Sequence, residues 1–313
     1  MQYLQVSLSA VGPLFLFLLL GWGLSRWKLA DGTVIACVNR MNHYVFLPAM
    51  LFKNIVGARL DLGAQWRLVA MAAAASLLSC LLAVLIARLT ERTEADRRAA
   101  LAQGMFRNNY ISYGIAIASS VFGAEGAQTV TLLIACIVPM NNVLAVIVLT
   151  AGCNGKISGK KLPTDIATNP YVIASVLGFI VAAIGVSFPR FIVSAFSDLT
   201  GLAIPLSMLM LGASFSFKSL KGYGRDIAVG VFVKLILLPL IFVPIYAAMN
   251  IRGVELLVLF IALATPPAAS SHVMAGQMGA DRTLAGHLIV FGSICSIATI
   301  FAWLYVLQAL TLI

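Results

Sequence analysis

The chain has 313 residues, of which 61% are hydrophobic and only 10% are charged, and its formal net charge is +10. A soluble domain carries about 25% charged residues, so the composition excludes an ordinary soluble protein and predicts an all-α integral membrane protein. The basic residues lie at the ends of apolar runs and form no patch interleaved with aromatic residues, which argues against nucleic acid as a partner.

Ten apolar runs predict ten transmembrane helices, because roughly 20 helical residues span the ~30 Å hydrocarbon core of a bilayer. The predicted spans cover residues 6–24, 33–53, 66–89, 97–121, 127–151, 170–188, 191–216, 226–249, 254–279 and 283–311. The longest connection, residues 153–169, is too short for a soluble domain. We therefore expect the function to reside in the membrane.

The distribution of Lys and Arg predicts that both termini lie outside. In that orientation the inner connections, near residues 26–28, 88–98, 156–161 and 218–225, hold most of the basic residues. Short cytoplasmic connections of membrane proteins carry an excess of Lys and Arg. Residues 153–169 are accordingly predicted to form a cytoplasmic connecting loop.

The fourth predicted span carries a cation at unusual depth. Arg107 lies ten residues after Arg97, which is about 15 Å along a helix. An arginine at the centre of a membrane helix costs roughly 2.5–3.5 kcal/mol, so it needs an interior partner or an anionic ligand. A substrate-facing or gating role and a structural bond to freed carbonyls both stay open. The adjacent Asn108 and Asn109 can cap a half-helix or hold a carboxylate, because an amide both donates and accepts hydrogen bonds.

Three further spans contribute candidates. Asn141 follows Pro139 at mid-depth in the fifth span, and the lack of an acidic residue there argues against carboxylate-based cation exchange. Asp198 lies about eight residues into the seventh span, where it either pairs with Arg190 or couples protons. Lys234 in the eighth span is expected to extend its long side chain to the inner interface, with ligand contact as the alternative.

The ninth predicted span is interrupted at residues 265–267 (TPP). Two prolines remove two backbone donors and push the preceding threonine, Thr265, out of the helical conformation, so the helix must break. We expect a second half-helix to begin at Pro266 and to direct its positive end into a polar cavity, as broken helices of secondary transporters do. Polar side chains near this break either contact a ligand or form hydrogen bonds within the protein. They are Thr265, Ser270, Ser271 and His272.

A constant offset of 157 positions relates several motifs of the chain. It pairs Pro48 in LPAMLF with Pro205 in IPLSMLML, and Asn109 in the fourth span with Pro266 in the ninth. Self-similarity at a fixed offset indicates an internal repeat.

Residues 1–152 and 170–313 would then form two related halves of five spans each. Because five is an odd number, the second half must insert upside down. The result is an inverted repeat in which the broken fourth and ninth helices cross near the midplane.

Four segments carry a resemblance to a known family. They are LPAMLF (47–52), FRNNYISYGIAIASSVFGAEGAQ (106–128), IPLSMLMLGASFSF (204–217) and ATPPAASSHVMAGQMGAD (264–281). In their order and spacing they resemble the auxin efflux carrier family, and within it the bacterial malate and malonate permease-like members.

The resemblance implies a fold shared with bile-acid symporters and sodium/proton antiporters. Spans 1, 2, 6 and 7 would be a scaffold, and spans 3–5 and 8–10 a moving transport domain. It also implies a homodimer through the scaffold in a bacterial cytoplasmic membrane. The chain departs from the plant members of the family: it lacks their long central hydrophilic loop, and Asn108-Asn109 stands where they have proline at the first crossover.

The favoured function is secondary active transport of a small organic anion by an elevator-like mechanism, because the intramembrane charge is positive. The alternatives are a sodium-coupled symporter of the bile-acid type, a carrier of auxin-like aromatic acids, and a receptor or channel. Enzyme motifs are lacking, and no cofactor or metal is expected; the coupling ion, H⁺ or Na⁺, stays open. The predicted substrate site comprises Arg107, Asn108, Asn109, Asn141, Thr265, Pro266, Ser270 and Ser271, with His272 and Asp198 as candidate coupling groups.

Overall fold

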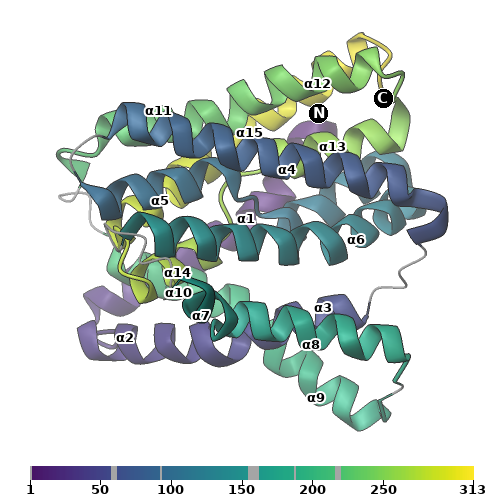
Figure 1. Ribbon diagram of the computed structural model, residues 1–313. Coiled ribbons are helices and arrows are strands. Elements are labelled where there is room, and N and C mark those ends of the chain that lie inside the picture. Colours follow the sequence, from purple (N-terminus) through teal and green to yellow (C-terminus); the bar gives the residue numbers. More distant parts are fainter. Residues whose placement is uncertain (1, 58–61, 92–93, 154–161, 187, 216–219) are drawn as a thin grey trace.

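The computed structural model describes the chain except residues 1, 58–61, 92–93, 154–161, 187 and 216–219. In these described parts the regular structure is helical throughout, and a helix lies on each apolar run of the sequence (Figure 1). Five helical stretches are long and apolar enough to cross a bilayer. They are Gln65–Thr90, Ala95–Cys153, Arg190–Ser214, Gly224–Ala248 and Arg282–Ala309. The protein is therefore an all-α integral membrane protein.

The first half of the chain forms the elements up to α6. They are α1 (Gln2–Arg26), α2 (Gly32–Met41), the π-helix η1 (Asn42–Phe46), α3 (Leu47–Val56), α4 (Leu62–Thr90), α5 (Ala95–Phe106) and α6 (Tyr110–Cys153). α6 is two helices joined at a turn, because Phe122 and Gly123 leave the helical conformation. Gly123 has φ of +58°, a conformation that glycine adopts without strain. The turn falls between the fourth and fifth predicted spans.

The second half contains the remaining elements. They are α7 (Leu162–Ala167), α8 (Pro170–Ile184), α9 (Arg190–Gly201), α10 (Ala203–Ser214), α11 (Gly224–Phe232), the π-helix η3 (Val233–Leu237), α12 (Leu238–Ala248), α13 (Gly253–Ala264), α14 (Ser270–Gln277) and α15 (Arg282–Ala309). The short helix α7 lies in the predicted connecting loop 153–169 and was not expected. Most of the rest of that loop lies outside the described residues.

The helices separate into two groups. Figure 1 shows α2, α3, α8 and α9 together at the bottom of the view, with α4, α5, α6, α11, α12, α13 and α15 above them. α1 packs most extensively on α10, and α3 on α8. A Cβ at Gly21 would overlap the carbonyl oxygen of Leu209, and one at Gly212 would overlap that of Leu18. Small residues of this kind let membrane helices pack with their backbones in contact.

Both π-helices precede a proline in the first turn of the next helix, Pro48 in α3 and Pro239 in α12. A proline ring clashes with the carbonyl four residues earlier and offers no N–H. A wider turn before the proline accommodates this defect, and such bulges are frequent at functional sites. The η3 bulge carries Lys234, whose surroundings belong to the candidate site.

Candidate functional site

Two broken helices meet in the middle of the protein. α5 ends at Phe106 and α6 begins at Tyr110, while α13 ends at Ala264 and α14 begins at Ser270. The breaks lie against each other, since the backbone N–H of Asn109 donates to the carbonyl oxygen of Pro266 at 2.8 Å. The contact thus pairs a backbone donor and a backbone acceptor that have no partner within their own helices, because both helices are broken there.

The second half-helix starts later than the sequence indicated. Thr265 is extended with ψ of 149°, as expected for a residue before proline, but α14 begins at Ser270 and not at Pro266. The expectation was wrong because Pro266 itself precedes Pro267, which disfavours the helical conformation at Pro266. The carbonyl of Pro266 is thereby free to accept the bond from the other break.

Side chains of the first break satisfy backbone groups of α13. The Asn108 Nδ2 atom donates to the carbonyl oxygen of Ala262 at 2.6 Å, and the Tyr110 hydroxyl donates to that of Val258 at 2.8 Å. Ala262 is among the last four residues of α13, whose carbonyls have no intrahelical partner, whereas Val258 lies one turn earlier. Of the two roles open from the sequence, Asn108 therefore fulfils the capping one through its amide nitrogen.

Arg107 is buried, with 4% of its surface exposed. Its Nη1 atom donates to Ser271 Oγ (3.3 Å) and Met274 Sδ (2.9 Å), and its Nη2 atom to Asn142 Oδ1 (2.5 Å) and Ser270 Oγ (2.9 Å). Every one of these partners is neutral. Within the described parts of the chain no carboxylate forms an ion pair with Arg107. The guanidinium is thus held in place while its charge is not neutralised.

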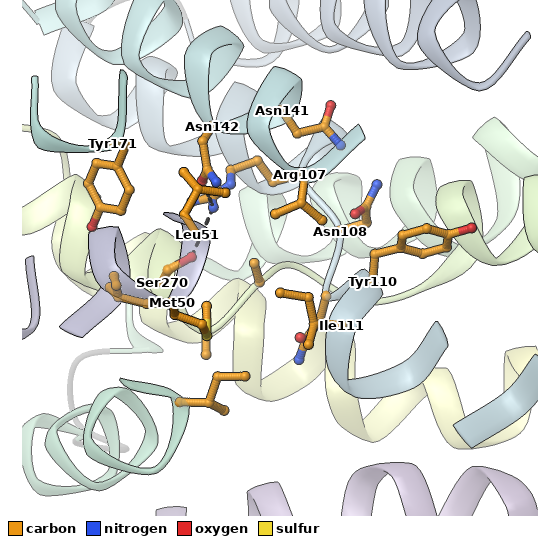
Figure 2. A pocket seen from close by; sticks show the side chains of 16 residues that line it. Met50, Leu51, Arg107, Asn108, Tyr110, Ile111, Asn141, Asn142, Tyr171 and Ser270 are labelled. Carbon is orange, nitrogen blue, oxygen red and sulfur yellow. Dashed lines mark hydrogen bonds between the residues drawn. The ribbon is translucent and has the colours of Figure 1, made fainter. Parts of the chain in front are cut away.

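A cavity of about 40 Å³ adjoins this guanidinium (Figure 2). Its polar wall is formed by side chains from the two breaks and from α6: Arg107, Asn108, Asn109, Asn141, Asn142 and Ser270. Part of the apolar lining comes from α3 (Leu47, Met50 and Leu51) and from α10 (Ile204). The volume suffices for a few water molecules and is well below the ~150 Å³ that holds a benzene. A dicarboxylate can enter only if these walls move apart.

Asn141 lines the cavity with 4% of its surface exposed, and neither polar atom of its amide has a hydrogen-bond partner among the described residues. A buried polar group without a partner costs about 1–3 kcal/mol. Two such atoms at the wall of a cavity point to a ligand or bound water. The Thr265 hydroxyl is also buried without a partner, but Thr265 does not line this cavity.

Lys234 is a second cation at the crossover, although its position in the sequence predicted that its side chain would reach the inner interface. The side chain is 1% exposed, and its Nζ atom donates to the carbonyl oxygen of Phe106 at 3.2 Å. Phe106 is the last residue of α5, where a cation is stabilised by the negative end of the helix. The expected extension to the interface is wrong. The sequence did indicate that Lys234 lies deep in the membrane, because it follows Arg225 by nine residues, much as Arg107 follows Arg97 by ten.

Asn142 lines the cavity as well, although only its neighbour Asn141 was predicted as a site residue. Asn142 bonds Arg107, whereas Asn141 faces the cavity unbonded. Successive residues of a helix point about 100° apart, and nothing in the sequence says which of the two faces Arg107. Tyr171 of α8 also lines the cavity, and its hydroxyl bonds His43 Nδ1 at 3.2 Å.

The two candidate coupling groups lie elsewhere. His272 is 2% exposed, and both of its ring nitrogens bond Arg282: Nδ1 lies 3.1 Å from the Arg282 carbonyl oxygen, and Nε2 accepts from Arg282 Nε at 2.9 Å. These two bonds fit the neutral imidazole, with the proton on Nδ1. Asp198 is exposed on α9, and no ion pair between it and Arg190 occurs in the described structure. Neither side chain lines the cavity at the crossover.

Comparison with known proteins supports a membrane role. The profile of the family described as membrane transport protein matches residues 6–304. A protein of Methanocaldococcus jannaschii described as an uncharacterized transporter is 27% identical over 201 residues. That match covers 62% of this chain and 63% of the relative, so it spans less than two thirds of the relative's length.

Proposed function

Since the chain belongs to the membrane transport protein family, that of the auxin efflux carriers, we propose that it is a secondary transporter of a small organic anion. The substrate class is a mono- or dicarboxylate such as malate or malonate, and the site is the cavity at the crossed breaks. The chemistry required is binding and release, with no bond made or broken in the substrate.

The uncompensated charge of Arg107 carries the proposal. A buried cation costs several kcal/mol unless an anion pairs with it, and the four partners of Arg107 are neutral. A carboxylate in the adjoining cavity would supply the missing charge through short charge-assisted hydrogen bonds. The unbonded amide of Asn141 would donate from its Nδ2 atom to the same carboxylate.

The composition of the cavity wall supports an elevator-like mechanism. Apart from Tyr171 of α8, its polar residues come from the break between α5 and α6, from α6 and from α14, which belong to the proposed transport domain. Part of its apolar lining comes from α3 and α10 of the proposed scaffold. Sliding of one group along the other would separate the two walls and admit substrate from either side. An apolar scaffold surface offers few hydrogen bonds that would resist such sliding.

The architecture that goes with this mechanism is ten spans in two inverted repeats, with both termini outside the cytoplasmic membrane of a bacterium. Under the 157-residue offset, α1 corresponds to α8 and α10 to α3. The close contacts α1–α10 and α3–α8 are then equivalent, which supports the repeat. A homodimer through the scaffold is proposed with it. Exposed apolar side chains on α8 and α9, including Ile184 at 70% and Phe191 at 73%, suit either lipid or a second copy.

The proposal is tested by replacing Arg107 and measuring uptake and binding on the same purified protein. Arg107→Gln keeps hydrogen-bonding capacity but removes the charge, and uptake of malate or malonate should be lost. Arg107→Lys keeps the charge without the planar fork, so carboxylate affinity should fall about tenfold. Binding is read as ligand-induced thermal stabilisation, with and without sodium and across pH, which also identifies the coupling ion.

The matched control is Arg225→Gln, which removes an exposed cation that does not line the cavity. It should transport like the unmodified protein. If Arg107 only clamps α6 to α14, Arg107→Gln will melt at a lower temperature while the surviving folded protein is stabilised by carboxylates as before. Undiminished stabilisation by carboxylates would reject Arg107 as the anion partner.

A further inference from the structure

A second, larger cavity lies between α4, α5 and α6. Its volume is about 480 Å³, and it shares no lining residue with the cavity at the crossover. Most of its lining is apolar. The lining residues are Cys80, Leu81, Val84, Arg88, Arg98, Ala99, Ala102, Leu144, Ile147, Val148, Ala151 and Gly152. We call this cavity the α4–α6 crevice.

The α4–α6 crevice has the length of a lipid chain segment. On α4 its lining runs from Cys80 to Arg88, and on α6 from Leu144 to Gly152, which is about 12 Å along each helix. One leaflet of a bilayer contributes about 15 Å of hydrocarbon. The crevice therefore follows most of the depth of one leaflet. Leucines of α4 beside it are largely exposed, Leu81 by 67% and Leu85 by 55%, as expected for a helix face in contact with lipid.

Two cations stand at one end of the crevice. Arg88 is near the end of α4 and Arg98 is in the first turn of α5. Neither has an acidic partner within the part of the chain that the structure describes. The preceding residue differs from Arg98 in its pairing: Arg97 bonds Asp226 at 2.5 Å and lies near two glutamates. Arg88 and Arg98 thus leave two guanidinium groups available to a ligand.

We propose that the α4–α6 crevice binds one anionic phospholipid, with its phosphate at Arg88 and Arg98 and an acyl chain along the apolar lining. Guanidinium groups bind phosphate through paired, charge-assisted hydrogen bonds. Basic pockets between membrane helices bind the headgroups of anionic lipids. An apolar crevice that ends in two arginines complements a molecule that has both a long apolar chain and a negative head. Free phosphate would use the arginines only.

The bound lipid would act on the transporter through α5. Its headgroup would join the end of α4 to the start of α5, the helix that ends beside Arg107. The proposal is independent of which anion is transported, since the crevice shares no residue with the site at the crossover.

The test is a lipid titration of the full-length protein in detergent, followed by native mass spectrometry. The probes are phosphatidylglycerol, phosphatidylcholine with the same acyl chains, and inorganic phosphate. We expect preferential binding of phosphatidylglycerol. Each arginine near a membrane surface contributes about fivefold to the affinity for anionic lipid. Arg88→Gln and Arg98→Gln should therefore each weaken phosphatidylglycerol binding about fivefold, and the double variant about 25-fold.

Arg225→Gln is the matched control, because it removes one exposed arginine that does not line the crevice. It should bind phosphatidylglycerol within about twofold of the unmodified protein. Val148→Trp fills the apolar part of the crevice without changing charge, and should weaken phosphatidylglycerol binding while leaving both arginines in place.

Three outcomes would overturn the proposal: equal binding of the two lipids, an Arg88/Arg98 double variant that still prefers phosphatidylglycerol, or displacement of the lipid by millimolar phosphate. If Val148→Trp does not fold, the arginine variants decide the question alone, because both arginines stand at one end of the crevice and pair with no acid among the described residues. Size-exclusion profiles of all variants confirm that the compared samples are folded.

Discussion

At the scale of single residues, the two buried cations of the crossover differ in their partners. Arg107 is held by four side chains, whereas Lys234 has one hydrogen bond within the described structure, to the last carbonyl of α5. The attraction of a cation to a helix C-terminus is worth about 0.3–1 kcal/mol, and up to about 2 kcal/mol when partly buried. Burying an ammonium group costs several kcal/mol. The cost of burying Lys234 therefore exceeds the stabilisation from the helix end. A buried charge that lowers stability in this way is typical of a functional group.

We therefore predict that Lys234→Met leaves thermal stability unchanged or raises it, while uptake of the carboxylate substrate falls. Methionine retains most of the apolar stem and removes the buried charge. The measurement is the melting temperature together with the uptake rate per folded protein. If Lys234 serves only to stabilise the end of α5, the melting temperature of the variant will fall and uptake per folded molecule will not change.

The sequence predicted how deep a residue lies along its helix better than it predicted the direction in which the side chain points. Counting residues from the helix end was enough to expect Arg107 deep in the protein. The same count applied to Lys234, but the length of a lysine stem allowed a route to the interface that the fold does not provide. The choice between Asn141 and Asn142 depended on helix rotation about Pro139, which only packing determines.

At the scale of helices, three connections are joined at one end of the molecule by a network around Arg97. Its Nε atom donates to Asp226 Oδ2 at 2.5 Å and its Nη2 atom to the carbonyl oxygen of Gly222, and its guanidinium lies over the Tyr223 ring. The Tyr223 hydroxyl donates to Asp281 Oδ2 at 2.7 Å. Burial raises the pKa of Tyr223 to about 12, and the hydrogen bond to Asp281 adds to the shift. The hydroxyl thus remains a donor at any physiological pH.

Replacing Arg97 should separate these helices. Asp226 is 2% exposed, and removal of its partner leaves a buried carboxylate unpaired. We predict that Arg97→Gln destabilises the protein by about 2 kcal/mol, the value of a hydrogen bond to a charged group. Arg225→Gln should change stability by less than about 0.5 kcal/mol, as exposed substitutions do. Chemical denaturation in detergent measures both, and equal stabilities would show that the network contributes nothing.

The interruption of the ninth predicted span shows what sequence can say about an element. Proline chemistry required a break after Ala264, and the structure has it there. The start of the next helix depended on a second effect, the restriction that Pro267 places on Pro266, and on the bond from Asn109 to the Pro266 carbonyl. The latter joins residues 157 positions apart, so the repeat indicated that the two breaks meet, but no local pattern identified the hydrogen bond between them.

At the scale of the whole molecule, hydrogen bonds between connections group them by side. The network of Arg97 joins the connections before α5, α11 and α15, since the backbone N–H of Asp281 also donates to the Asp96 carbonyl oxygen at 3.2 Å. At the other end, Gly253 N–H donates to the carbonyl oxygen of Leu312 at 2.8 Å. The connection before α13 and the C-terminus therefore lie on one side of any membrane. Composition predicted a membrane protein and the distribution of Lys and Arg predicted which connections share a side; these long-range contacts group the connections independently of charge.

These groupings match the predicted orientation, in which the connections before α5, α11 and α15 are cytoplasmic and the C-terminus is outside. We predict that a reporter fused after Gly155, in the loop outside the described residues, is active in the cytoplasm, and that one fused after Ile313 is active outside. Five predicted spans separate the two points, and an odd number of crossings must reverse the side. A fusion after Asn250, which precedes α13, provides the control and should report the same side as Ile313. If the fusions after Gly155 and Ile313 report one side, the second half has an even number of crossings, and the inverted repeat is lost with it.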